Sequence, residues 1–325
     1  MSYKKILLQA LKTTWRNKYL WFFGLFAALL SQNGGFGAFL QLTDTKSEGN
    51  LGSGFMRYYE TGVFSGQAFK TLGDFIVSDP LSFIIFVTIF LLLAVLSLFL
   101  LWLAIVSQAS LVNNSALDAS GKKHSFREGL EVGMEKFWSV LGVNAIFKII
   151  SSLIVLIVTL PLLLNVYSKG FSVSSFVFIL LFIISLPIII SISFIAKYAI
   201  CFIVIKKEAL KESFCSALNL FKKNWVVSIE MGIMLVLINF LFGLVFLLLV
   251  LLLSIPVLFI AFIFANLNFM LAFWLALLFG LCLLFFLIIL FGVLLTTFQT
   301  AVWTGVFMQL IGKGMKSKIM RFFTR

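Results

Sequence analysis

The stretch KKNWVVSIEMGIM, residues 222–234, decides the fold of this 325-residue chain. Two lysines precede Asn224 and Trp225, and an apolar run follows in which Glu230 is the only charged residue before Lys313. Bases and a tryptophan ahead of a long apolar run are typical of the point where a chain enters a lipid bilayer. The stretch therefore predicts a membrane-spanning helix, and it raises the question of what a carboxylate does inside one.

The composition extends this interpretation to the whole chain. Apolar residues make up 62% of the sequence and charged residues only 11%, and the mean hydropathy is +1.15. A soluble domain has about a quarter of its residues charged. An ordinary soluble protein is therefore excluded. We predict an all-α polytopic transmembrane helical bundle that forms a single integral membrane domain over residues 1–325.

Six apolar runs are candidates for crossing the bilayer, which takes about 20 apolar residues in a helix. The predicted spans are roughly 19–41, 81–112, 138–165, 172–203, 225–265 and 269–311. The first is the weakest, because only its initial part is strongly apolar. Residues 42–80 are predicted to form an outer loop. For residues 225–311 we predict two long helices joined by a turn at Asn266–Asn268 rather than four short ones.

The basic residues indicate the orientation. Twenty of the 25 lysines and arginines lie at the two ends of the chain and in every second connection, and the alternate connections hold four. Cytoplasmic connections carry such an excess. We therefore expect both termini in the cytosol. Since the net charge of +13 is spread over clusters that flank apolar runs, we expect a bilayer with anionic lipids as the partner and no nucleic acid.

Three of the basic segments resemble one another. Each begins with a lysine pair, spaces apolar residues at helical intervals among charges, and ends at a tryptophan: Trp21, Trp138 or Trp225. A helix of this kind lies in the headgroup plane, where tryptophan also prefers to sit. The pattern predicts amphipathic interfacial helices on the cytosolic face, with these tryptophans as anchors. It fits either an internal threefold repeat or the general tendency of basic connections between spans.

Two charged residues lie inside predicted spans and outside the basic connections, and such residues are costly in lipid. Lys148 lies ten residues after Trp138, and Glu230 lies five residues after Trp225. In parallel spans they would differ in depth by about 7–8 Å, which a lysine side chain can bridge by extending toward the interface. They are a candidate intramembrane ion pair. Alternatively, each reaches water separately.

No catalytic, metal-binding or nucleotide-binding motif stands out, and we expect neither enzymatic activity nor a cofactor. His124, the only histidine, is expected to be a solvated polar residue. The three cysteines lack the spacing of a disulfide framework or a zinc site.

Three segments carry a family resemblance: SLVNNSALDASGKKHSFREGLEVG (110–133), KYAICFIVIKKEALKESFCSALNLFKKNW (197–225) and TTFQTAVWTGVFMQL (296–310). Together they resemble the six-span membrane domain associated with bacterial glycerophosphoryl diester phosphodiesterases and related uncharacterised integral membrane proteins. The resemblance implies a multi-pass protein of a bacterial cytoplasmic (inner) membrane. It supplies no catalytic residues, and the chain lacks the soluble phosphodiesterase domain.

The sequence thus predicts a multi-pass membrane protein that is not an enzyme, with a scaffold, lipid-organising or accessory role. The alternative is a transporter or channel for a small or lipid-like solute. The sequence leaves open whether the chain forms a homo-oligomer or binds another protein.

Overall fold

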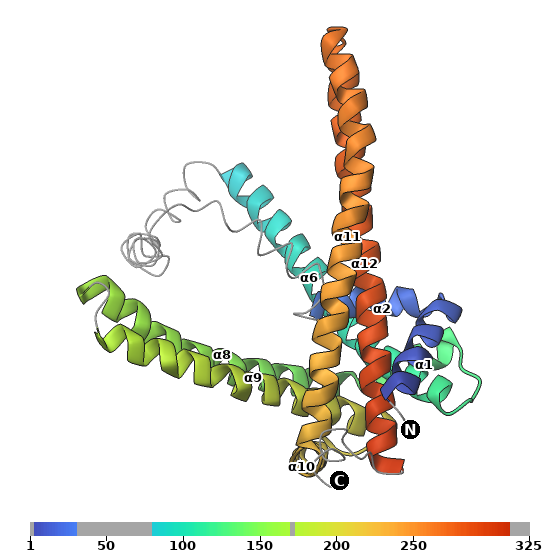
Figure 1. Cartoon of the computed structure of the whole chain (residues 1–325), viewed down its shortest axis with the longest axis vertical. Helices are drawn as coiled ribbons and strands as arrows, with labels where there is room; N and C mark the ends of the chain where they lie inside the picture. The colour runs from blue at the N-terminus through green and yellow to red at the C-terminus, as the bar shows by residue number, and fades with distance from the viewer. Residues whose placement is uncertain (1–2, 31–79, 170–172, 313–325) are drawn as a thin grey trace. The chain divides into compact units, whose positions relative to one another are not determined.

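The computed structural model describes residues 3–30, 80–169 and 173–312, and side chains within these ranges except at 162–169 and 173–175. Every regular element in these ranges is a helix (Figure 1): α1 (Tyr3–Arg16), α2 (Leu20–Leu30), α6 (Pro80–Ala119), α7 (Phe126–Glu135), α8 (Phe137–Lys169), α9 (Val173–Ile205), α10 (Leu210–Lys223), α11 (Trp225–Asn266) and α12 (Met270–Gly312). The all-α prediction is confirmed.

Five helices are long and apolar enough to cross a membrane: α6, α8, α9, α11 and α12. They coincide with the last five predicted spans. The predicted span 19–41 is described only as α2, an apolar helix of 11 residues, and the rest of that span lies outside the described residues, as does the outer loop apart from Pro80. Six spans therefore remain a prediction.

The surface of these helices is what a membrane requires. Large apolar side chains such as Leu98 on α6, Leu248 on α11 and Leu271 on α12 are exposed along most of their length. Contiguous apolar surface of this extent is not found on monomeric soluble proteins. The helices therefore fit a multi-pass membrane protein, with these side chains facing lipid.

The turn predicted between the last two spans is confirmed. Asn268 adopts a left-handed backbone with φ 54°, and the Phe269 amide donates to the Phe264 carbonyl over 3.0 Å. This is a Schellman ending, in which asparagine is one of the few residues that tolerate the left-handed position. Helices α11 and α12 then run side by side as one hairpin (Figure 1), and α11 continues through Pro256.

The chain divides into two compact units. Unit 1 comprises Met1–Leu40, Leu103–Asn144 and Phe194–Arg325, and unit 2 comprises Gln41–Trp102 and Ala145–Ser193. The single-domain prediction is not tested by this division. All the contacts described below lie within unit 1.

Helix α12 is the centre of packing in unit 1, because α11, α1 and α2 all contact it. The approach of α2 depends on Gly24. A Cβ atom at this position would lie 2.1 Å from the Thr297 hydroxyl oxygen and 3.0 Å from the Val293 carbonyl oxygen. Only a residue without a side chain lets the two backbones come this close.

The other face of α2 packs on α6 and α7. Leu20, Phe23 and Ala27 form a buried cluster with Leu111 of α6. The Phe23 ring also stacks on Phe126 of α7, with 4.8 Å between ring centroids. Helix α2 therefore joins the N-terminal segment to two other parts of the chain.

Two helix breaks have the same backbone hydrogen bonds. The Lys136 amide ends α7 by donating to the Val132 carbonyl, and the Lys136 carbonyl accepts from Val140 in α8. Between α10 and α11 the Asn224 amide donates to the Leu220 carbonyl, and the Asn224 carbonyl accepts from the Ser228 amide. In both places a single residue separates the end of a short helix from the start of a long apolar helix.

Candidate functional site

The carboxylate that the opening stretch placed inside a span has a partner. The Tyr3 hydroxyl of α1 donates a hydrogen bond to Glu230 of α11. Lys148 is exposed on α8 and belongs to unit 2, whereas Glu230 belongs to unit 1. The pairing of Lys148 with Glu230 therefore stays a prediction, and Tyr3 is a contact that the sequence did not reveal.

The three tryptophans lie at equivalent places, at the first or second residue of α2, α8 and α11. Trp138 is 78% exposed and Trp225 is 53% exposed. Trp21 is partly buried, and its indole N–H donates to the Thr14 carbonyl of α1 over 2.8 Å. That carbonyl lies in the last turn of α1, where no helical partner exists, so Trp21 also fastens α1 to α2.

The expectation for His124 was wrong. Its side chain is only 7% exposed, and both ring nitrogens have partners. Nδ1 contacts the Tyr19 hydroxyl, and Nε2 lies 3.2 Å from Asp118 Oδ1. A histidine in a lysine-rich loop looks solvated, but a polar side chain can be buried when each of its polar atoms is paired.

The network continues from Asp118 into α1. Its Oδ2 accepts from the Thr13 hydroxyl, and its Oδ1 also lies 3.5 Å from the Asn17 amide nitrogen. One turn earlier, the Gln9 amide donates to the Ala119 carbonyl at the end of α6 over 3.3 Å. Side chains from the two elements thus hold α1 against the C-terminal turn of α6.

The electrostatics of the network indicate which group donates. Tyr19 lies in the turn ahead of α2, outside the five membrane-spanning candidates. Burial, followed by the charges of Asp118 and Glu128, raises the pKa of Tyr19 to about 12. The phenol therefore stays protonated at neutral pH and can donate to His124 Nδ1, which leaves Nε2–H to donate to Asp118.

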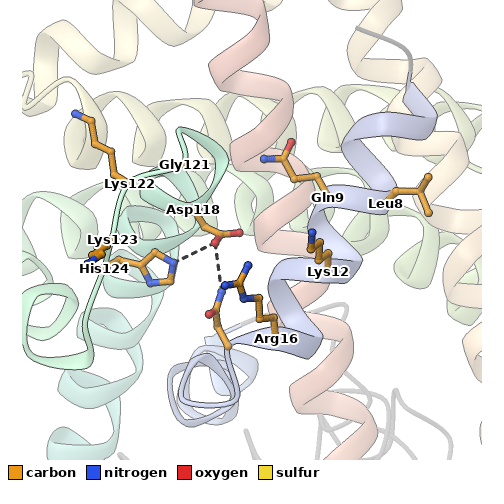
Figure 2. Close-up of a pocket in the computed structure, with 10 residues that line it drawn as sticks. Leu8, Gln9, Lys12, Arg16, Asp118, Gly121, Lys122, Lys123 and His124 are labelled. Atoms are coloured by element: carbon orange, nitrogen blue, oxygen red, sulfur yellow. Dashed lines mark hydrogen bonds and ion pairs between the residues drawn. The ribbon is translucent and has the colours of Figure 1, made fainter.

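A cavity of about 770 Å³ opens beside this network (Figure 2). Lys12 and Arg16 reach it from α1, one turn apart, and Lys122 and Lys123 come from the segment that follows α6. Asp118 and His124 form part of its wall. The sequence shows the four bases but not that they line one cavity, because nothing in it pairs residue 12 with residue 122.

The turn that delivers Lys122 depends on Gly121. This residue has φ 71°, and the Lys122 amide donates to the Leu117 carbonyl over 3.0 Å. The chain thus leaves α6 by a Schellman ending, and the lysine pair that follows lies in the wall of the cavity. Ser125 then caps α7 by accepting from the Glu128 amide over 3.2 Å, as an S-x-x-E capping box does.

Sequence reasoning also missed a cation inside a span. Lys197 was counted with the basic connection that follows, but it lies within α9, about two turns before the end of that helix. Its ammonium group lies 4.7 Å from the centre of the Trp303 ring on α12. An aromatic face stabilises a cation removed from water, so Lys197 joins α9 to α12.

Polar side chains also pair between helices. The Asn144 amide donates to Gln108 Oε1 over 2.7 Å, which links α8 to α6. All three cysteines are free. Among the described residues no group of three histidine, cysteine or acidic side chains could hold a metal ion.

No family model, no curated protein and no solved structure matches this chain. The functional argument therefore depends on the residues themselves.

Proposed function

We propose that the chain is a multi-pass protein of a bacterial cytoplasmic membrane that organises anionic lipid at its cytosolic face and is not an enzyme. One observation carries the proposal. Three short helices, α1, α7 and α10, each end within a few residues of an apolar helix. A basic residue lies just ahead of each apolar helix, namely Lys18, Lys136 and Lys223, although α7 itself carries three glutamates against one arginine.

The charges suit this role. Lys211, Lys222 and Lys223 on α10 are exposed, as are Lys4 and Lys5 on α1. A lysine close to an anionic membrane surface contributes about 1 kcal/mol of attraction. Several such residues on helices anchored to spans would concentrate anionic lipid around the protein without any single strong contact.

The proposal includes three copies of one unit made of a short interfacial helix followed by two apolar spans. The matching hydrogen bonds around Lys136 and Asn224 support it. Each short helix also buries two small residues four positions apart: Ala10 and Thr14, Gly129 and Gly133, Ser213 and Ala217. Small residues at this spacing allow close helix contact.

Packing supports the same arrangement. Helix α7 lies on the helix that precedes it, since Gly133 approaches the Val106 carbonyl and the Ser110 hydroxyl of α6. Helix α1 packs on α12. Helix α12 would thus make for α1 the contact that α6 makes for α7.

The orientation and the location are also part of the proposal. The ends of α6, α8 and α9 that adjoin the basic connections all fall in unit 1 together with α1 and α10, which is consistent with both termini facing the cytosol. Six spans are inferred from the apolar runs and the alternation of basic connections, and membership of the phosphodiesterase-associated membrane family is inferred from the sequence resemblance.

The test uses the full-length protein in phosphatidylcholine vesicles that contain a small fraction of fluorescent phosphatidylglycerol. Energy transfer from the protein's tryptophans reports how close that lipid lies. We expect more transfer than to labelled phosphatidylcholine, less transfer at high salt, because exposed charges are screened, and less after replacing Lys211, Lys222 and Lys223 by glutamine. Asn219→Gln, on the exposed side of the same helix, should change nothing. Equal transfer to both lipids at low salt would refute the lipid-organising role.

Transport of a small or lipid-like solute is the second candidate, favoured by Lys148 and Glu230 inside spans and by proline within α8, α9 and α11. Flux into proteoliposomes that disappears in Lys148→Ala or Glu230→Ala would support it. If the two residues pair, the exchange Lys148→Glu with Glu230→Lys should restore what each single change removes.

A further inference from the structure

The cavity between α1 and the end of α6 carries more positive charge than its own carboxylate balances. Lys12, Arg16, Lys122 and Lys123 line it, and Asp118 is the one carboxylate among its described lining residues. Both Asp118 oxygens already accept hydrogen bonds from neighbouring side chains. Within 3–30, 80–169 and 173–312 no ion pair involves any of the four bases. Because like charges repel, an anion in the cavity would stabilise this part of the fold.

The chemistry of the bases favours phosphate. An arginine can donate two parallel hydrogen bonds to one phosphate group, and lysines act as mobile point charges beside it. Here Arg16 is joined by Lys12 from the same helix and by two lysines from another segment. The volume of about 770 Å³ is in the usual range for sites that hold small organic groups.

The surface of α1 beside the cavity indicates that the phosphate belongs to a lipid. Leu8, Leu11 and Trp15 are large, apolar and exposed. At 100° per residue they share an arc of roughly 60°, and Lys12 and Arg16 lie directly beside that arc. A soluble phosphate would make no use of this apolar strip, whereas a phospholipid could lay its acyl chains along it.

We propose that this cavity binds the phosphate headgroup of one anionic phospholipid, with its acyl chains along Leu8, Leu11 and Trp15. Arg16 and Lys12 hold the phosphate from α1, and Lys122 and Lys123 add positive charge from the wall formed by the segment after α6. The bound lipid thus bridges two elements that the Tyr19–His124–Asp118 network already joins. This inference rests on the proposed membrane location, and it adds a single saturable site to the diffuse attraction proposed above.

The experiment measures lipid bound to the intact full-length protein by native mass spectrometry from a neutral detergent. Phosphatidylglycerol, phosphatidylcholine and glycerol 3-phosphate are titrated in separate arms. We expect one phosphatidylglycerol to bind well before further copies, and the double variant Lys12→Gln with Arg16→Gln to weaken this first step at least about tenfold, since charge-assisted bonds to phosphate are lost. Phosphatidylcholine should bind more weakly.

The matched control is Lys206→Gln with Lys207→Gln, which removes the same charge from the connection between α9 and α10, outside the cavity lining. This control should leave the first binding step unchanged. Equal weakening by both double variants would overturn the cavity as the site. Binding of glycerol 3-phosphate as tight as that of phosphatidylglycerol would overturn the assignment to a lipid.

The site and the proposed function fail in different ways. If native mass spectrometry shows no tight first binding of phosphatidylglycerol, while energy transfer in vesicles still favours that lipid, only the cavity site is rejected. A tight, salt-resistant first step without preferential transfer to phosphatidylglycerol would reject the lipid-organising role alone. Lys122→Gln with Lys123→Gln provides a second variant outside any helix, so a defect in α1 folding cannot explain both results.

Discussion

The side-chain amide of Gln299 donates a hydrogen bond to Asn239 Oδ1 over 2.8 Å and so joins α12 to α11. Asn239 is the fifteenth residue of α11, well inside a helix that faces lipid over most of its surface. In hydrocarbon an amide that loses its partner finds no water to replace it. The pair therefore fixes how the two helices of the hairpin align.

Breaking this pair should cost stability. We expect Gln299→Leu or Asn239→Leu to destabilise the protein by about 0.6–2 kcal/mol, and the double variant to cost less than the sum of the two. The measurement is a double-mutant cycle from unfolding in detergent mixtures. Purely additive effects would show that the two amides do not interact.

A second prediction concerns the contact of α2 with α12. Gly24→Ala places a methyl group against Thr297 and the Val293 carbonyl, so α2 must move away. We expect a loss of about 1–3 kcal/mol, as in overpacked cores, read as a lower midpoint of thermal unfolding. Gly243→Ala is the matched control, because no heavy atom lies within 4 Å of its added Cβ, and it should be neutral or slightly stabilising.

The buried histidine gives a third prediction. His124→Ala leaves the Tyr19 hydroxyl without its partner and leaves Asp118 Oδ1 with only the Asn17 amide, and we expect a loss of about 1–3 kcal/mol. Arg127→Ala, three residues away, removes only an exposed ion pair with Glu131 and should cost well below about 1 kcal/mol. Thermal unfolding in one detergent compares the two. Equal midpoints would mean that the network contributes nothing.

The raised pKa of Tyr19 predicts a pH dependence. The folded protein favours the neutral phenol, with a pKa of about 12 against the ordinary 10.0. The stability that Tyr19 contributes is therefore complete below pH 10 and is lost as pH rises through about 12. The difference in stability between the wild type and Tyr19→Phe should shrink over that interval. A difference that stays constant would contradict the assignment.

The natural cysteines test the topology without mutation. Cys215 is exposed on α10, Cys282 is exposed within the apolar length of α12, and Cys201 is buried. A charged, membrane-impermeant maleimide should label Cys215 from the cytosolic side only, because the other two thiols lie in lipid or in protein. Labelling of Cys215 from the outside of intact cells would reverse the proposed orientation.

The lengths and positions of the apolar runs made most of the fold predictable. Five spans and the turn at Asn268 follow from apolar length and from one break, both of which are local properties of the sequence. Trp138 and Trp225 were found for the same reason, since each marks a helix start.

The polar contacts were not predictable, because each joins residues far apart in the chain. Tyr3 donates a hydrogen bond to Glu230, and Asp118 accepts one from Thr13 and contacts His124. Helical spacing shows which face a residue occupies but not which element packs against that face. The cavity escaped notice for the same reason, although all four of its bases were counted when the orientation was derived.

The α11–α12 hairpin has a mechanical consequence for its surroundings. Its helices contain 42 and 43 residues, about 63 Å of rise, and apolar side chains cover them to the tip. The hydrocarbon layer is only about 30 Å thick, so a hairpin that crosses it along the membrane normal would have roughly half of each helix inside the layer. Helices α1 and α2 cover part of the remainder on α12. The exposed apolar side chains that are left need a tilted hairpin, a locally thicker leaflet or a neighbouring protein, and each of these changes the bilayer around them.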